Sequence, residues 1–180
     1  CYVQNINIDV SNATTTYTGG ILGYDTGSGS IQNCYTQGKI ISEGNNTGGI
    51  AGSMTYGNIK NCYSKVNISS EGSSIGGIAG NISNNKEEVS NNLSIGNIYT
   101  TVGQTGLNRI IGNGGDAASN NYAYEEQKIN GYIEEDELGA TLLSKEQILN
   151  LSLGESYSYE GKEEGILPKL YNTEKTELLP

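Results

Sequence analysis

The 180-residue chain has no histidine, phenylalanine or tryptophan, and it has few prolines, methionines and cysteines. Without histidine it cannot form a Ser-His-Asp or Cys-His catalytic arrangement, or a zinc site of the HExxH type. Without Phe or Trp, its core must be assembled from Ile, Val, Leu and small side chains, which favours narrow, repetitive packing. No run of 18 apolar residues occurs, so we expect no membrane-spanning helix.

Basic residues are also scarce, and the formal net charge is −10. This charge argues against nucleic acid as a partner, because binding a phosphate backbone requires clustered Lys and Arg. Residues 1–120 carry 7 acids and 5 bases, whereas residues 121–180 carry 13 acids and 5 bases. The asymmetry predicts two regions that divide near Asn121. The acidity favours solubility in a secreted protein over an acidic recognition patch.

Short glycine-rich words recur through the first region. GGIAG occurs at residues 48–52 and 76–80, and the variant GGILG occurs at residues 19–23. A second word, Asn-Cys-Tyr, follows at residues 33–35 and 61–63. Aligning the chain on that word divides it into residues 1–33, 34–61, 62–91 and 92–120, with a fifth unit that starts at Asn121. This period of roughly 30 residues indicates a solenoid.

Each unit contains three short apolar words separated by Gly, Asn, Ser and Thr, a pattern typical of strands. We therefore predict an all-β fold, a right-handed parallel β-helix of four to five coils, over residues 1–120. Residues 121–180 are expected to form a small, acidic α/β cap that closes the open end of the stack. A capping box of Ser144 and Gln147, with Leu143 and Ile148 as a hydrophobic staple, predicts one short helix there. A further strand is expected near residues 129–133.

Alternation along the first word of each coil assigns side chains to the two faces of a sheet. It places Cys34 and Cys62 inside, where they form a structural ladder together with Ile50 and Ile78. Stacked cysteines on parallel strands lie about 4.8 Å apart with parallel Cβ vectors, which does not suit a disulfide. We expect buried free thiols that act as small hydrophobic groups.

The same alternation places an apolar row on the outer face. Two interpretations remain open for it: a self-stacked ladder, or a surface that contacts another molecule. If the rings are exposed, Tyr→Ser changes in this row should cost much less stability than Ile→Asp changes in the interior ladder. The candidate contact residues are Tyr35, Tyr63, Leu93 and Tyr122.

No residue pattern in the chain predicts catalysis. The acidic pairs at residues 125–126 and 134–135 contain the carboxylates that glycoside cleavage would need, but no acid in the coils recurs at a fixed register. The glycine words lack the Lys-Ser/Thr ending of a phosphate loop, and the turns near Asp25 and Glu43 lack a calcium-loop motif. We therefore assign no catalytic, cofactor-binding or metal residue, and a polysaccharide-degrading β-helix is the least favoured alternative.

The words GGIAG and GNIKNCYS at residues 57–64 together resemble the GLUG repeat of bacterial surface proteins. The end of the chain narrows the resemblance, because the words there are similar to the junction of immunoglobulin A1 protease-type zinc metallopeptidases of streptococci and related Gram-positive bacteria. Those words are NNYAY at residues 120–124, GILPKL at residues 165–170 and ELLP at residues 177–180.

This resemblance implies a secreted, cell-wall-attached protease whose catalytic domain and zinc site lie downstream of Pro180. No catalytic or metal residue of that family falls on this chain. The chain would be a non-catalytic scaffold and possible substrate-docking surface, with its own catalytic domain and immunoglobulin A1 or another host protein as partners. The tail lacks the tryptophans associated with that junction, which leaves a different substrate open. The alternative is a repeat segment of an adhesin that binds a host protein or glycan.

Overall fold

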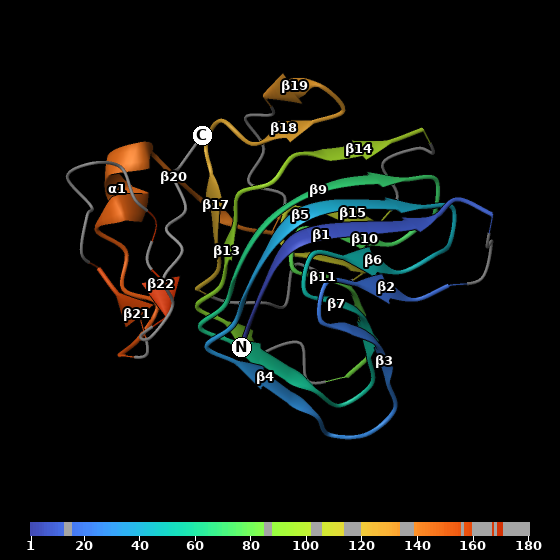
Figure 1. Cartoon of the computed structure of the whole chain (residues 1–180), viewed down its shortest axis with the longest axis horizontal. Helices are drawn as coiled ribbons and strands as arrows, with labels where there is room; N and C mark the ends of the chain where they lie inside the picture. The colour runs from blue at the N-terminus through green and yellow to red at the C-terminus, as the bar shows by residue number, and fades with distance from the viewer. Residues whose placement is uncertain are drawn as a thin grey trace.

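The structure is a computed structural model that describes residues 1–12, 16–84, 88–101, 106–113, 120–133, 139–155, 157–159, 167 and 169–170. Parallel strands stack in successive coils into a β-solenoid, and a smaller segment lies beside the stack (Figure 1). The acidic residues 134–137, and most of the words at residues 165–170 and 177–180, lie outside the described residues. No helix in the described ranges is long and apolar enough to cross a membrane.

The longest sheet, sheet A, contains the first strand of every coil. Its strands run parallel except for the hairpin of β18 and β19, and residues at equivalent coil positions pair, as Tyr35 does with Tyr63. The hairpin turn is Asn130-Gly131, where both residues have positive φ. The sheet contains β1 (Tyr2–Val10), β5 (Tyr35–Ser42), β9 (Tyr63–Ser70), β13 (Leu93–Ser94), β14 (Ile98–Thr100), β17 (Tyr122–Tyr124), β18 (Lys128–Ile129), β19 (Tyr132–Ile133) and β20 (Thr141–Leu143).

Three further sheets complete the coils. Sheet B contains β2 (Thr18–Gly19), β6 (Thr47–Gly48), β10 (Ile75–Gly76) and β15 (Leu107–Asn108). Sheet C contains β3 (Leu22–Asp25), β7 (Ala51–Met54), β11 (Ala79–Ile82) and β16 (Ile111–Asn113). Sheet D contains β4 (Ser30–Gln32), β8 (Asn58–Lys60) and β12 (Val89–Ser90).

The first three coils therefore have four strands each, and the prediction of three strands per coil is wrong. The middle word of the second coil does not form one strand, because the chain turns at Gly49 and Ile50 between β6 and β7. Glycine allows this turn to pack closely against the neighbouring segments. A Cβ atom on Gly49 would overlap the Ser64 hydroxyl and the Gly77 carbonyl oxygen of neighbouring segments.

Asparagine makes the turn from sheet D back into sheet A. Two residues before the first strand of coils two to five stands Asn33, Asn61, Asn91 or Asn120, and each has φ between 51° and 55°. Asparagine enters this left-handed region more readily than other non-glycine residues. The recurring Asn of the Asn-Cys-Tyr word thus has a conformational role at each coil boundary.

Inward-facing side chains fill the stack along its length. Ile50, Ile78, Cys34 and Cys62 are buried in one cluster, in the direction that the alternation predicts, and both cysteines are free. In the fourth coil, Arg109 stands where earlier coils have glycine, and its buried side chain donates from Nη1 to the side-chain and backbone oxygens of Gln127 at 3.1 and 3.2 Å.

After Asn121 the chain first adds strands to the stack and then forms a segment beside the coils. Strand β20 pairs with β17 at the end of sheet A. Helix α1 (Lys145–Leu149) has the predicted capping box, with Gln147 N donating to Ser144 Oγ at 3.3 Å. The hairpin of β21 (Tyr157–Ser158) and β22 (Lys169–Leu170) lies beside the coils together with α1 (Figure 1). The division at Asn121 remains a prediction.

Candidate binding groove on sheet A

The predicted outer row of sheet A is largely covered. Tyr35, Tyr63 and Leu93 project away from the coil interior, but each is at most 1% exposed, so of the two open interpretations a surface that contacts another molecule does not fit these three residues. Tyr122 is half-buried beside them. The Tyr35 and Tyr63 rings stack in parallel with centroids 4.7 Å apart, which agrees with a self-stacked ladder.

The chain's own C-terminal segment supplies the cover. Ile148 of α1, Leu153, Tyr157 and Leu167 are buried in one cluster with the outer row. The Tyr157 ring lies 6.1 Å from the Tyr63 ring, and its hydroxyl donates to the carbonyl oxygens of Cys34 at 3.0 Å and Asn61 at 2.9 Å. Alternation in the coils cannot reveal this cover, because the covering residues lie about 100 residues away in sequence.

Beyond the cover, the same outer face opens into a groove of about 390 Å³. Its lining comes from coils two to five, where the first half of sheet A bends into the second between β13 and β14. Gly38 and Gly96 form part of its lining, and a Cβ on either residue would overlap backbone atoms of Ile6 or Val66 in the neighbouring coil. The remaining lining residues are Gln37, Lys65, Asn67, Ile95, Asn97, Tyr124, Glu126 and Lys128.

Two stacked asparagines present hydrogen-bond donors to the groove. Asn67 Oδ1 accepts from Asn97 N at 2.9 Å, and Asn97 Oδ1 accepts from Lys128 N at 2.8 Å. Because both amide oxygens are held by backbone N–H groups of the next coil, the orientation of both carboxamides is defined. Both side chains are exposed, and no described residue accepts from their Nδ2 atoms.

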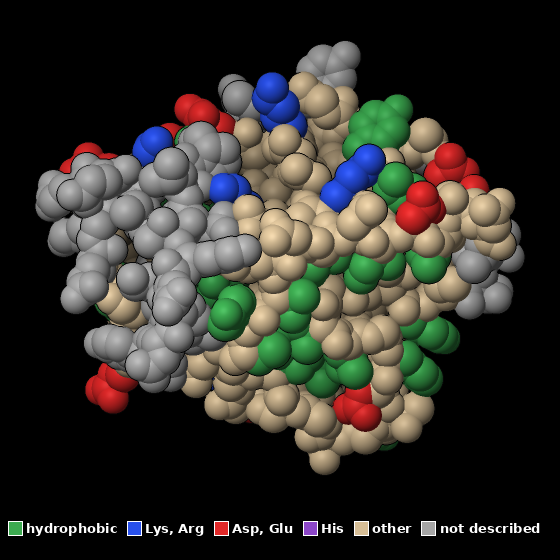
Figure 2. All heavy atoms as spheres, in the orientation of Figure 1, with side chains coloured by type: hydrophobic (Ala, Val, Ile, Leu, Met, Phe, Trp, Pro, Cys, Tyr) green, Lys and Arg blue, Asp and Glu red, His purple; other side chains and the backbone are tan. Residues whose placement is uncertain are grey.

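Charged groups lie at both sides of these amides. Lys65 is half-buried and Lys128 is exposed, so the groove has two cations in a chain that is acidic overall. In Figure 2, Lys and Arg side chains gather in the upper half of the molecule, where Figure 1 places β5, β9, β14 and β18. At one end, the Tyr124 hydroxyl donates to Glu126 Oε2 at 3.0 Å, and burial followed by this hydrogen bond raises the pKa of Tyr124 to about 12.

In the later coils, asparagine occupies the position of the ladder cysteines. At this position, the side chain faces backbone carbonyls of earlier coils: Cys62 Sγ lies 3.1 Å from Lys60 O and 3.7 Å from Ile31 O, and Asn92 Nδ2 donates to Ile59 O at 2.8 Å. Contact with the Cys34 thiol, and then burial, raise the pKa of the Cys62 thiol. These groups complete backbone pairing inside the stack and face no opening.

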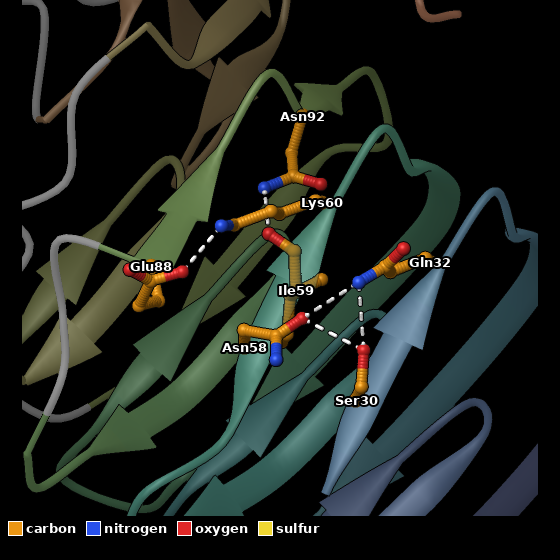
Figure 3. A network of polar contacts seen from close by, with 7 residues as sticks. All are labelled: Ser30, Gln32, Asn58, Ile59, Lys60, Glu88 and Asn92. Atoms are coloured by element: carbon orange, nitrogen blue, oxygen red, sulfur yellow. Dashed lines mark hydrogen bonds and ion pairs between the residues drawn. The ribbon is translucent and has the colours of Figure 1, made fainter.

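Sheet D has a separate polar network on its outer face. Figure 3 shows Asn58 accepting from Ser30 Oγ at 2.8 Å and from Gln32 Nε2 at 3.2 Å, and Lys60 paired with Glu88. The same view shows Asn92 reaching the Ile59 carbonyl. Each contact joins one coil to the next, so the network has a structural role.

Metal chemistry receives no support from the described part of the chain. There, no three His, Cys, Asp or Glu side chains are grouped so that they could hold a metal ion. The Asp25 carboxylate instead accepts from Gly27 N at 3.0 Å and Gly29 N at 2.9 Å, which closes its own turn. The zinc of the resembled proteases thus has no candidate ligand set among these residues.

The alternation that places Tyr63 on the outer face of sheet A also places Lys65 and Asn67 there, but the sequence did not identify a site at these residues. Asn97 lies 30 residues after Asn67, one coil period, and Lys128 lies 31 residues further. That spacing is the available signal for the groove. It is weak, because every outward residue of a solenoid recurs at the same period.

Comparisons with known proteins agree with this architecture. Residues 43–69 match the GLUG motif. The fold is similar to a crystal structure described as that of a "putative immunoglobulin A1 protease" from Bacteroides ovatus, with a TM-score of 0.61 and 18% sequence identity. That similarity covers 96% of this chain and 76% of the other. No curated protein matches the sequence.

Proposed function

We propose that this chain is the non-catalytic β-helical module of an immunoglobulin A1 protease-like zinc metallopeptidase. The observation that carries the proposal is the extent of the fold similarity: it covers 96% of the chain, and therefore includes the C-terminal segment as well as the coils. The GLUG motif at residues 43–69 supports the same assignment. The Bacteroides ovatus protein gives no support for an origin in a Gram-positive bacterium.

In this proposal the module acts as a scaffold and substrate-docking surface beside a catalytic domain outside the chain, and the parent is secreted or held at the cell wall. Two features support docking. Polar side chains of coils two to five converge in one open groove. The C-terminal segment covers the apolar half of the same sheet face, so the groove lies beside the segment that would lead to the catalytic domain.

Two observations test the proposal. The parent sequence should contain HExxH within a few hundred residues after Pro180, and its absence would exclude a zinc metallopeptidase of this type. The 180-residue chain should also bind immobilised immunoglobulin A1, measured by biolayer interferometry. A matched double variant, Lys65→Gln with Lys128→Gln, should weaken that binding, whereas Lys145→Gln on α1 should leave it unchanged.

The second candidate is an adhesin segment that binds a host protein or glycan. It is favoured by one observation, that the groove is formed wholly by this chain and requires no catalytic domain to complete it. Binding by the chain together with a parent sequence that lacks HExxH would establish this reading over the first.

A further inference from the structure

The groove on sheet A has a chemical character that narrows its ligand, and this inference rests on the docking role proposed above. We propose that the groove binds an oligosaccharide that carries carboxylate groups, such as a uronic acid oligomer.

Donors dominate the middle of the groove. The Nδ2 groups of Asn67 and Asn97 are held outward because their amide oxygens accept from Asn97 N and Lys128 N. Lys128 adds an ammonium group that has no partner among the described residues, and Lys65 adds a second cation. A ligand for these groups must be rich in acceptors, and charge complementarity favours an anionic one.

One end of the groove requires a ligand group that donates hydrogen bonds. Glu126 is exposed, and its carboxylate accepts from the Tyr124 hydroxyl, so it offers further acceptor capacity and no donor. A simple inorganic anion would be repelled there. A sugar acid presents carboxylate acceptors to the lysines and hydroxyl donors to Glu126, which satisfies both ends of the groove.

The position of the groove on the face of the sheet disfavours an extended peptide. Peptides that add to sheets pair with free backbone groups at an edge strand. Here β5 and β9 are paired with strands on both sides, and their backbone groups are engaged in the ladder. Recognition in the groove must therefore come from side chains.

The size of the groove also suits a pyranose ring. Ile95 and Tyr124 line it but are only 2% and 5% exposed, so contacts to a ligand come chiefly from the polar side chains around them. A cavity of about 390 Å³ is at the lower end of the size range for small-molecule sites, which suits one or two sugar units. The remainder of an oligomer would lie along the exposed face.

The test uses the 180-residue chain and isothermal titration with trigalacturonic acid, with a neutral galactose trimer, a tetraglutamate peptide and inorganic phosphate as comparison probes. We expect binding of the uronate trimer that weakens with rising salt, and at least tenfold weaker binding of the neutral trimer. Absence of uronate binding, equal binding of the neutral trimer, or tighter binding of the peptide or phosphate would overturn the proposal.

Two variants locate the binding. Asn97→Asp keeps the oxygen that accepts from Lys128 N but replaces the outward donor with an anionic acceptor, and should weaken uronate binding by about tenfold or more. Lys128→Gln should weaken it by several-fold, and Lys145→Gln, with the same charge change on α1, by less than about twofold. Unchanged binding by both groove variants, with unchanged melting temperatures, would place the ligand elsewhere.

These experiments distinguish a failure of the ligand proposal from a failure of the proposed docking function. If the uronate does not bind, but the chain still binds deglycosylated immunoglobulin A1 and loses this binding in the Lys65→Gln, Lys128→Gln double variant, then only the ligand class is wrong. If the uronate binds and no antibody does, the docking role is wrong and the groove remains a sugar-acid site.

Discussion

The hydroxyl of Tyr157 donates to the carbonyl oxygen of Cys34, 123 residues earlier in the chain, at 3.0 Å. It also lies 2.9 Å from the carbonyl of Asn61, so one side chain of the C-terminal segment contacts the chain just before β5 and just before β9. This contact explains why the outer tyrosines are buried.

The Tyr157 contact leads to the first prediction. Tyr157→Phe keeps the ring but removes the donor from two carbonyls, and should lower the free energy of unfolding by about 1–3 kcal/mol. Urea unfolding followed by circular dichroism measures the change. Tyr99→Phe, at a residue that is 52% exposed, is the control and should change stability by less than about 0.5 kcal/mol. Equal effects would show that the C-terminal segment does not hold the coils.

Burial of the outer row changes what a substitution there should do. Tyr63→Ser removes a ring that packs between Tyr35 and Tyr157, and should cost about 3–5 kcal/mol, comparable with a large-to-small core change. From the sequence, a small cost was expected only if the rings were exposed. In the same urea experiment Tyr99→Ser should have little effect. If Tyr63→Ser costs as little stability as the control, the outer tyrosines are exposed to solvent and not buried.

The interior asparagine ladder gives a third prediction. Asn92 accepts from Cys62 N at 3.0 Å and donates to Ile59 O at 2.8 Å, so Asn92→Ala leaves a buried N–H and a buried carbonyl without these partners. We expect a loss of about 2–4 kcal/mol in thermal or urea unfolding. The exposed Asn84→Ala is the matched control. If both variants unfold at the same midpoint, the ladder contributes nothing to stability.

Close packing at the GGIAG sequences gives a fourth prediction. Gly49→Ala places a methyl group against the Ser64 hydroxyl and the Gly77 carbonyl, and should destabilise the coil stack by about 1–3 kcal/mol. Gly27→Ala, where a Cβ would meet Asp25 Oδ1 at an ordinary 3.4 Å, should be close to neutral. Melting temperatures of the two variants make the comparison, and a neutral Gly49→Ala would contradict the packing.

Stability should also fall at alkaline pH. Burial raises the pKa of Tyr157 above its ordinary value of 10.0. The folded state therefore retains a proton that the unfolded state releases. The stabilising contribution of this group is complete below about pH 10 and declines as the pH rises above that value. Urea midpoints should decrease between about pH 10 and 11, and Tyr157→Phe should flatten that decline. A constant midpoint would refute this.

The sequence by itself determined the repeating parts of this protein. The recurrence of GGIAG and Asn-Cys-Tyr predicts a solenoid and its coil period, and the alternation around Cys34 and Cys62 predicts which side chains face inward. These are local properties, because each coil contacts its neighbours in register and the same pattern is repeated. The capping box of Ser144 and Gln147 is likewise a local signal, because it is contained within four residues.

Only the tertiary structure decided what lies over the outer face. The division of each coil into four strands depends on the turn at Gly49 and Ile50, which a strand pattern does not distinguish from an extended run. The cover over Tyr35 and Tyr63 depends on Tyr157 and on where the C-terminal segment packs. No periodicity encodes that contact, because it joins residues from a repeating region to residues from a non-repeating one.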